Sequence, residues 1–179
     1  MSERPITDFY QVSLKKREKF ESEIGYFTNT YNIKMGQEIF VQDSISFIKK
    51  IATVKGLHLQ NPPFAQAKLV TVLIGEIIDY IVDLRPSSKT YLHYGKVTIS
   101  EENKNTLFIP RGFAHGYITT KENTIISYKV DNQYSPEHER TINWQDGTLG
   151  LDWPKYNQYF LSDKDKNAKK LKELEIEID

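Results

Sequence analysis

The sequence predicts an all-β domain, built as a sandwich or a barrel. β-Branched and aromatic residues gather in runs of about four to eight residues, and these runs recur at short spacing. Glycine, proline, asparagine or serine separates the runs, as expected for turns. Short strands joined by turns are typical of sandwiches and barrels. The 179 residues are enough for one well-cored domain that spans residues 1–179.

The elements are predicted in chain order. Residues 1–37 are polar and irregular and predict an N-terminal arm, with a strand near residues 25–27. Two β-branched runs, 69–74 and 77–84, flank Gly75-Glu76, which suits a two-residue hairpin. Further strands are expected at 96–99, 106–109, 116–119 and 124–130. Turns are expected at 110–112 and 134–136.

The C-terminal segment, residues 162–179, has a different pattern. Ser162 and Asp165 have the spacing of a capping box, with aspartate in place of the usual Glu or Gln. Ala168, Leu171 and Leu174 then recur every three residues. This spacing predicts a short amphipathic helix whose charged face is solvated.

Composition excludes several classes of function. The formal net charge is zero, so neither nucleic acid nor membrane is an expected partner. The absence of cysteine excludes disulfides and thiolate chemistry, and it fits a cytoplasmic location. The N-terminus has no apolar signal core, and the most apolar stretch, residues 69–78, is too short to span a bilayer.

Motif spacing excludes further chemistry. The nine glycines form no Gly-x-Gly-x-x-Gly loop, and no Gly-x-Ser-x-Gly elbow is present. Pro110-x-Gly112-x-x-His115 resembles the second metal motif of cupin barrels. The first cupin motif requires His-x-His, where this chain has His58-Leu59-Gln60. We therefore expect no metal site, because histidine with weak partners holds a metal poorly.

Acid–base chemistry remains, because histidine titrates near neutral pH. Alternation along the strand predicts that Gly56, His58 and Gln60 share one face and that Lys55 lies on the other. The same alternation points Tyr128 into the barrel. A buried histidine or tyrosine is more often a hydrogen-bonded core residue than a catalyst, so that alternative stays open at this point.

Several longer motifs carry a resemblance to a known family. They are Gly56-Leu57-His58, Gln66-Ala67-Lys68-Leu69-Val70, Val82-Asp83-Leu84-Arg85, Ser100-Glu101-Glu102-Asn103-Lys104, the stretch 109–116, Tyr128-Lys129, the stretch 134–139 and the stretch 149–154. In this order and spacing, about two thirds of the chain, from Gln42-Asp43 to Asp165, resembles the dTDP-4-dehydrorhamnose 3,5-epimerase family.

The resemblance implies a cupin-type β-jelly roll that forms a homodimer, with the N-terminal arm at the interface and no metal or other cofactor. It implies a nucleotide-linked 4-keto-6-deoxy sugar as substrate, inverted at C3 and C5 for deoxysugar and surface polysaccharide synthesis. The family's base falls on His58, its orienting aspartate on Asp165, its proton-returning tyrosine on Tyr128 and its enolate-stabilising lysine on Lys68. The family's positions of substrate contact fall on Gln42, His115 and Glu139, and Lys55 and Tyr134 are further predicted contacts.

Two of these roles have plain alternatives in the sequence. Asp165 is also the third residue after the Ser162 cap, and both roles are compatible if the helix start lies against His58. Lys68, without the matching pattern around it, would be interpreted as a surface lysine.

The chain departs from the family where the nucleotide is held. Lys55 stands in place of an arginine, and lysine lacks the bidentate fork for phosphate. Ile24, Asn29 and Ser44 replace the family's arginine, glutamate and asparagine. The chain is therefore predicted to keep the family reaction, and a different nucleotide such as CDP, a different 4-keto sugar or inversion at one carbon are the alternatives. A non-catalytic sugar-binding cupin and a metal-dependent cupin are the competing hypotheses.

Overall fold

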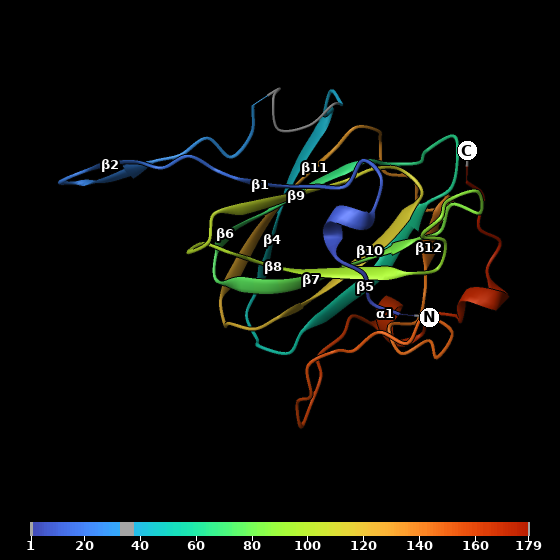
Figure 1. Ribbon diagram of the computed structural model, residues 1–179. Helices are drawn as coiled ribbons and strands as arrows, with labels where there is room; N and C mark the ends of the chain where they lie inside the picture. Colours follow the sequence, from blue (N-terminus) through green and yellow to red (C-terminus); the bar gives the residue numbers. More distant parts are fainter. Residues whose placement is uncertain (1, 33–37, 179) are drawn as a thin grey trace.

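Two antiparallel sheets of five strands each pack face to face in the computed structural model, which describes residues 2–32 and 38–178 (Figure 1). The first sheet consists, from edge to edge, of β1 (Ser13–Lys16), β9 (Asn105–Ile109), β6 (Lys68–Ile74), β11 (Thr124–Val130) and β4 (Gln42–Ile48). The second consists of β12 (Glu139–Thr141), β5 (Val54–Gln60), β10 (Phe113–Thr119), β7 (Glu76–Asp83) and β8 (Tyr94–Ser100). The all-β prediction is confirmed, and the arrangement is a β-jelly roll.

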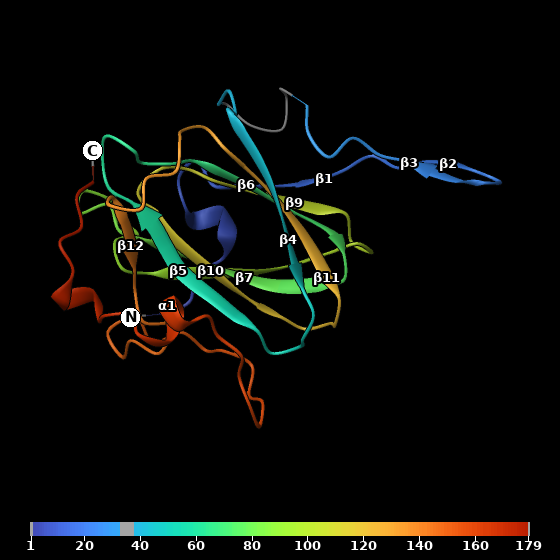
Figure 2. The ribbon, with the colours of Figure 1, turned by 180° about the vertical axis from the view of Figure 1, so that it is seen from behind.

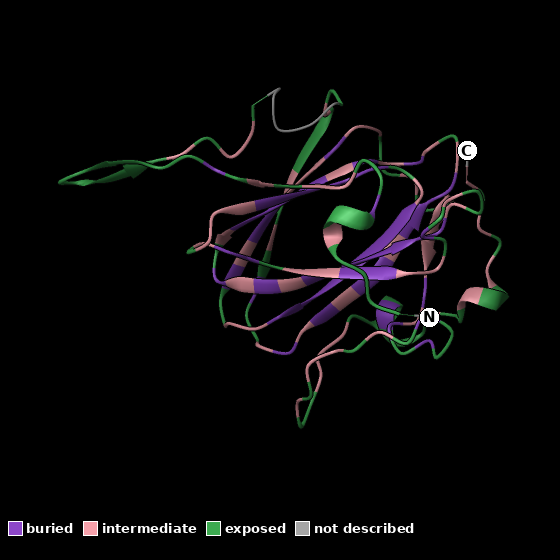
Figure 3. Ribbon diagram, in the orientation of Figure 1, coloured by how far each residue is buried: buried purple, intermediate pink, exposed green. Residues whose placement is uncertain are grey.

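The second sheet is buried on both faces. Its inner face joins the core between the sheets, where Ile77 and Ile81 of β7 pack with Val70 and Val72 of β6. Its outer face is covered by the chain after β12, whose Trp144 packs on that sheet together with Trp153 and other apolar residues. All seven residues of β10, in the middle of this sheet, are consequently buried (Figure 3). Side chains of β10 therefore experience little solvent on either face.

The predicted hairpin at Gly75-Glu76 is wrong. β6 and β7 are consecutive, but they belong to different sheets and the chain crosses between the sheets at Gly75. Gly75 has φ +84°, and a Cβ there would lie 2.3 Å from Thr124 Oγ1. The Gly75 N–H donates to the Glu101 carboxylate at 3.1 Å. Glycine at this point thus permits a tight corner between layers rather than a turn within one sheet.

The predicted C-terminal helix is mostly absent. α1 (Asp163–Lys166) is one turn long, and only a short 3₁₀ turn, η3 (Leu171–Glu173), follows it. The cap is confirmed, since the Ser162 side chain accepts a hydrogen bond from the Asp165 N–H. Leu171 and Leu174 pack on the outer face of the second sheet instead of forming a helical stripe. Burial against that face outweighs the weak helical periodicity, because so short a helix has little stability of its own.

The segment before β4 has two parts. η1 (Ile6–Asp8) and β1 belong to the body, since Phe9 is buried in the core and β1 pairs with β9. β2 (Phe20–Ser22) and β3 (Gly25–Phe27), which includes the predicted strand, form a hairpin that extends away from both sheets (Figure 2). Across residues 2–32 and 38–178, no helix has the length and apolar character needed to cross a membrane.

The loop after β7 provides a test of stability. Asp83 is fully buried and accepts hydrogen bonds from Arg85, Ser88 and Thr90, with distances from 2.6 to 3.1 Å. We expect Asp83→Ala to lower the free energy of unfolding by about 3 kcal/mol, because it leaves the Arg85 charge without its partner. Urea unfolding measures this change.

The matched control is a solvent-exposed ion pair on the protein surface. Glu102→Ala removes the exposed partner of Lys121 and should leave the urea midpoint almost unchanged, because surface ion pairs contribute little to stability. Equal losses for the two variants would show that burial of the Asp83 network contributes nothing.

Candidate functional site

A bulge in β5 brings Lys55 and His58 to the same side of the strand. His115 of β10 pairs with His58, but Tyr117, two residues on, pairs with Lys55, so β5 contains one extra residue here. The predicted alternation is therefore wrong for Lys55, which faces the same pocket as His58. Gly56 has φ +102°, and a Cβ on it would lie 2.6 Å from Gly116 Cα. Two glycines thus allow the strands to approach closely at the bulge.

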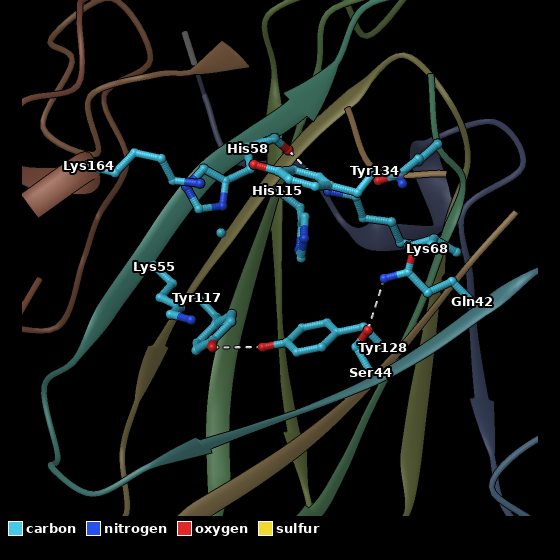
Figure 4. A pocket seen from close by; sticks show the side chains of 13 residues that line it. Gln42, Ser44, Lys55, His58, Lys68, His115, Tyr117, Tyr128, Tyr134 and Lys164 are labelled. Carbon is cyan, nitrogen blue, oxygen red and sulfur yellow. Dashed lines mark hydrogen bonds between the residues drawn. The ribbon is translucent and has the colours of Figure 1, made fainter. Parts of the chain in front are cut away.

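A pocket of about 360 Å³ opens between the two sheets (Figure 4). β4, β6 and β11 of the first sheet contribute to its walls, as do β5 and β10 of the second and the α1 turn. It is lined by Gln42, Ser44, Lys55, His58, Gln66, Lys68, His115, Gly116, Tyr117, Tyr128, Val130, Tyr134 and Lys164. This wall combines cations, imidazoles and phenols, which suits an anionic ligand and acid–base chemistry.

Asp165 holds the imidazole of His58. Asp165 is 1% exposed, and its Oδ1 lies 2.7 Å from His58 Nε2. The Ser162 hydroxyl donates to its other oxygen at 2.6 Å, and the Gly56 N–H donates to Oδ1 at 3.2 Å. Burial raises the pKa of Asp165, but hydrogen bonds from His58 and Ser162 outweigh burial and leave it lowered. A carboxylate only accepts, so Nε2 carries the hydrogen and Nδ1 keeps the basic lone pair.

Two tyrosines lie across the pocket from His58. Tyr128 of β11 and Tyr117 of β10 have their hydroxyl oxygens 2.7 Å apart (Figure 4). Their rings are stacked at 6.4 Å between centroids. Burial is the main cause that raises the pKa of both phenols above the usual value. Both hydroxyls are therefore protonated at neutral pH, as a proton donor requires.

Lys68 is not a surface lysine. It lines the pocket with its Nζ 3.5 Å from the His58 carbonyl oxygen. Burial lowers the pKa of its ammonium to about 8, although the carboxylate of Glu139 acts in the opposite direction. The ammonium is therefore charged at pH 7 and titrates in the mildly alkaline range.

His115 contacts the carboxyl of Asp79, which lies deeper in the protein. Its Nδ1 is 3.5 Å from Oδ1 of Asp79, which is fully buried on β7. Burial raises the pKa of Asp79 well above its usual range and lowers the pKa of His115 well below its usual range. We therefore regard the contact as one between two neutral groups, because an ion pair there would lose the solvation of both charges.

Glu139 organises another part of the wall. Its carboxylate accepts hydrogen bonds from the Tyr134 hydroxyl and from Lys164 Nζ, each at 2.8 Å. Burial raises the pKa of Glu139, and these two hydrogen bonds more than offset that effect, so the pKa is lowered. Gln42 donates to the Ser44 hydroxyl at 3.1 Å beside them. The carboxylate thus fixes one phenol and one ammonium of the wall.

The structure brings the nine predicted site residues together. Seven of them line the pocket, and the other two, Asp165 and Glu139, lie behind it as hydrogen-bond acceptors. Sequence reasoning missed Tyr117, although its position two residues after His115 on one strand was a usable signal. It also missed Asp79 and Lys164. Nothing in the local pattern places β7 against this pocket, and the start of α1 was expected beside His58 only because of Asp165.

The position that replaces a cupin metal ligand does not face the pocket. Gln60 donates to the backbone carbonyls of Phe64 and Gln133 and accepts from the Ser135 N–H. Within the part of the chain that the structure describes, no group of three or more His, Asp and Glu side chains is arranged to hold a metal ion.

Comparisons with known proteins agree on one family. The family model described as dTDP-4-dehydrorhamnose 3,5-epimerase matches residues 6–173. A relative with that name from Sinorhizobium fredii is 42% identical over 171 residues, which cover 93% of this chain and 88% of the relative.

Solved structures give the same result. The Bacillus anthracis enzyme, crystallised with TDP and pyrophosphate bound, has a TM-score of 0.85 and 39% identity, over 89% of this chain and 94% of that one. The Legionella pneumophila enzyme, in complex with dTDP-4-keto-L-rhamnose, has a TM-score of 0.89 and 34% identity, over 96% and 93%. These similarities extend over nearly the whole chain, so the cupin-like jelly roll predicted from the resemblance is confirmed. The chain belongs to the dTDP-4-dehydrorhamnose 3,5-epimerase family of sugar epimerases.

Proposed function

We propose that this protein inverts C3 and C5 of a nucleotide-linked 4-keto-6-deoxyhexose. The reaction would serve deoxysugar synthesis for surface polysaccharides. It would take place in the cytoplasm, a location that the cysteine-free composition fits. The observation that carries the reaction is the position of His58, backed by Asp165, across the pocket from Tyr128. Epimerisation removes a proton on one face of the sugar and returns one on the other, so it needs two acid–base groups on opposite sides.

His58 acts as the base in this proposal. The 4-keto group makes the hydrogens at C3 and C5 acidic, and the free Nδ1 of His58 accepts one of them. The Asp165 carboxylate then stabilises the imidazolium that forms, in the way that carboxylates support histidine bases in other enzymes. The electron pair left on carbon delocalises into the carbonyl and gives an enolate.

Lys68 stabilises that enolate, and Tyr128 protonates it. An ammonium aimed at developing negative charge in a water-poor site is often the largest single contribution to such a reaction. Lys68 is half-buried in the pocket wall and charged at neutral pH, which supports this role. Tyr128 then donates its proton to carbon from the sheet opposite His58.

The nucleotide is proposed to be dTDP, which the Legionella relative binds as its sugar conjugate. Lys55 and Lys164 supply positive charge to the same pocket and would contact the diphosphate. A CDP-linked sugar is the second candidate. Lys55 and Ser44, two positions at which this chain departs from the family, both line the pocket. Ile24, a third departure, is 99% exposed at the projecting hairpin.

Deuterium exchange tests the proposed reaction. The protein is incubated in D₂O with dTDP- or CDP-linked 4-keto-6-deoxyglucose, and NMR follows deuterium at C3 and C5. We expect incorporation at both carbons with the dTDP sugar. Incorporation at a single carbon would identify a monofunctional epimerase, and a faster reaction of the CDP sugar would identify the other nucleotide. No incorporation from either sugar would leave a non-catalytic binding protein.

Variants of the two acid–base residues separate their roles. His58→Asn should reduce exchange at both carbons by about 10²-fold or more, because it removes the base. Tyr128→Phe should retain exchange and lose inversion, because His58 can still remove the proton and return it to the same face. His93→Asn is the matched control, since His93 contacts Ser2 far from the pocket and should leave both rates unchanged. Full activity of His58→Asn would remove this residue from the base role.

The pKa of Lys68 predicts the alkaline limit of activity. The free-enzyme ammonium is charged below about pH 8 and neutral above it. We therefore expect kcat/KM to fall as pH rises through about 8, because the enolate loses its cation. In Lys68→Arg the guanidinium stays charged, so the fall near pH 8 should disappear even if the rate is lower. The same fall in both proteins would assign it to another group.

We also propose that the protein is a homodimer. β4 lies at an edge of the first sheet. Its Ile45 and Phe47, and Val41 just before it, are exposed to between 54% and 67%. The projecting β2–β3 hairpin exposes Phe20 and Phe27. An open sheet edge with apolar side chains favours pairing with another chain.

Light scattering after size exclusion measures the assembly. We expect twice the 20.9 kDa mass of one chain. Ile45→Asp together with Phe47→Asp should give monomers, because two charges would be buried in the interface. Tyr91→Asp, at a comparably exposed aromatic residue outside β4, should remain a dimer. A monomeric unmodified protein at micromolar concentration would contradict the proposal.

A further inference from the structure

The hydroxyl of Tyr117 lies in the pocket but has no role in the reaction proposed above. It lies 2.7 Å from the hydroxyl of Tyr128, inside the pocket, and the Tyr117 residue is 2% exposed. The two tyrosines come from different sheets, β10 and β11, so their contact spans the gap between the layers. A buried phenol needs a hydrogen-bond partner, and the partner of Tyr117 is the proposed proton donor (Figure 4).

We propose that Tyr117 is a positioning residue for Tyr128, which holds the Tyr128 hydroxyl against the substrate and donates a hydrogen bond to its oxygen once the proton has left. This inference rests on the proposed function, because it assigns a role only if Tyr128 is the proton donor. Tyr117 would act through Tyr128 and need not contact the sugar.

The step balances as a simple proton transfer. The electron pair of the enolate forms the new C–H bond with the proton of Tyr128. The O–H bond of Tyr128 breaks, and its electron pair stays on Oη as a phenolate. The Tyr117 hydroxyl, which accepts from Tyr128 at rest, rotates and donates to that phenolate while keeping its own proton. Before the next turnover the Tyr128 phenolate takes a proton from solvent and the His58 imidazolium releases one, so both groups return to their starting state.

The surroundings explain why such a donor matters. Burial is the largest cause that raises the pKa of Tyr128. Tyr117 is the next cause, because at rest its oxygen accepts from Tyr128 and favours the protonated phenol, and Asp79 acts in the same direction. Tyr117 therefore helps a phenolate only after its hydroxyl has rotated to donate. A buried charge without a hydrogen-bond partner is costly, and hydrogen bonds to charged oxygens are about twice as strong as neutral ones. Ser46, on β4, lowers the pKa of both phenols and so favours the ionised form of each. The Tyr117 hydroxyl, 2.7 Å from the Tyr128 oxygen, is the group placed to donate directly to a Tyr128 phenolate.

Tyr117→Phe tests the inference, because it keeps the ring and removes the hydroxyl. In D₂O, exchange with retention reports proton return by His58, and inverted, deuterated product reports delivery by Tyr128. We expect inversion to fall about 10- to 100-fold, as for loss of one hydrogen bond to a charged oxygen, while exchange with retention persists. The ratio of retained exchange to inversion should therefore rise by the same factor, with little change in KM.

A purely structural role predicts a different result. A loosened pocket would slow exchange and inversion together and leave their ratio unchanged. Tyr80→Phe is the matched control, because it removes a buried tyrosine hydroxyl that donates to the Asp152 carbonyl, away from the pocket. It should not alter the ratio.

A second variant keeps the test decisive if Tyr117→Phe folds poorly. Tyr117→3-fluorotyrosine has nearly the same size and a more acidic hydroxyl, so it is a stronger donor and should lower the ratio. An unchanged ratio in a folded Tyr117→Phe, or in the fluorinated protein, would overturn the role of Tyr117 while the epimerase proposal stands. Absence of exchange in the unmodified protein would instead contradict the proposed function itself.

Discussion

The carboxylate of Asp165 is the interaction on which the rest of the site depends. It accepts hydrogen bonds from the His58 ring, from the Gly56 backbone at the β5 bulge and from Ser162 at the start of α1. One buried charge therefore connects the C-terminal turn to the strand that supplies the proposed base. It also decides which ring nitrogen of His58 keeps its lone pair. Without this turn, the β5 bulge and the His58 ring would lose a shared hydrogen-bond acceptor, and the tautomer of His58 would no longer be fixed.

The gap between the sheets sets the electrostatics of the pocket. Lys68 is charged there, whereas His115, Asp79 and the two phenols are held neutral by burial. Such a wall presents cations to an anionic substrate and protonated phenols to carbon, with little water to weaken either. The same burial makes each unpartnered charge costly. Hydrogen bonds between polar groups of the wall, such as the one between Tyr117 and Tyr128, are therefore stronger than they would be in water.

Much of the fold follows from local pattern, and its failures have a common cause. The runs around β8, β9 and β11 and the Ser162 cap were predicted correctly, because alternation and capping are properties of a few neighbouring residues. The hairpin at Gly75 and the long C-terminal helix were wrong. In both cases the conformation is decided by packing on a second layer, at Thr124 for Gly75 and at the outer sheet face for Leu171.

The sequence by itself determined the chemical inventory and the family, through motifs whose order and spacing extend along most of the chain. It could therefore assign His58, Tyr128, Lys68 and Asp165 before any contact was known. Only the tertiary structure decided that Lys55 turns toward His58 and that Tyr117 meets Tyr128. The first depends on the bulge where β5 pairs with β10 inside the second sheet, and the second depends on how β10 and β11 face each other across the two sheets. Residues close in sequence cannot specify either arrangement, because both involve strands that are distant along the chain.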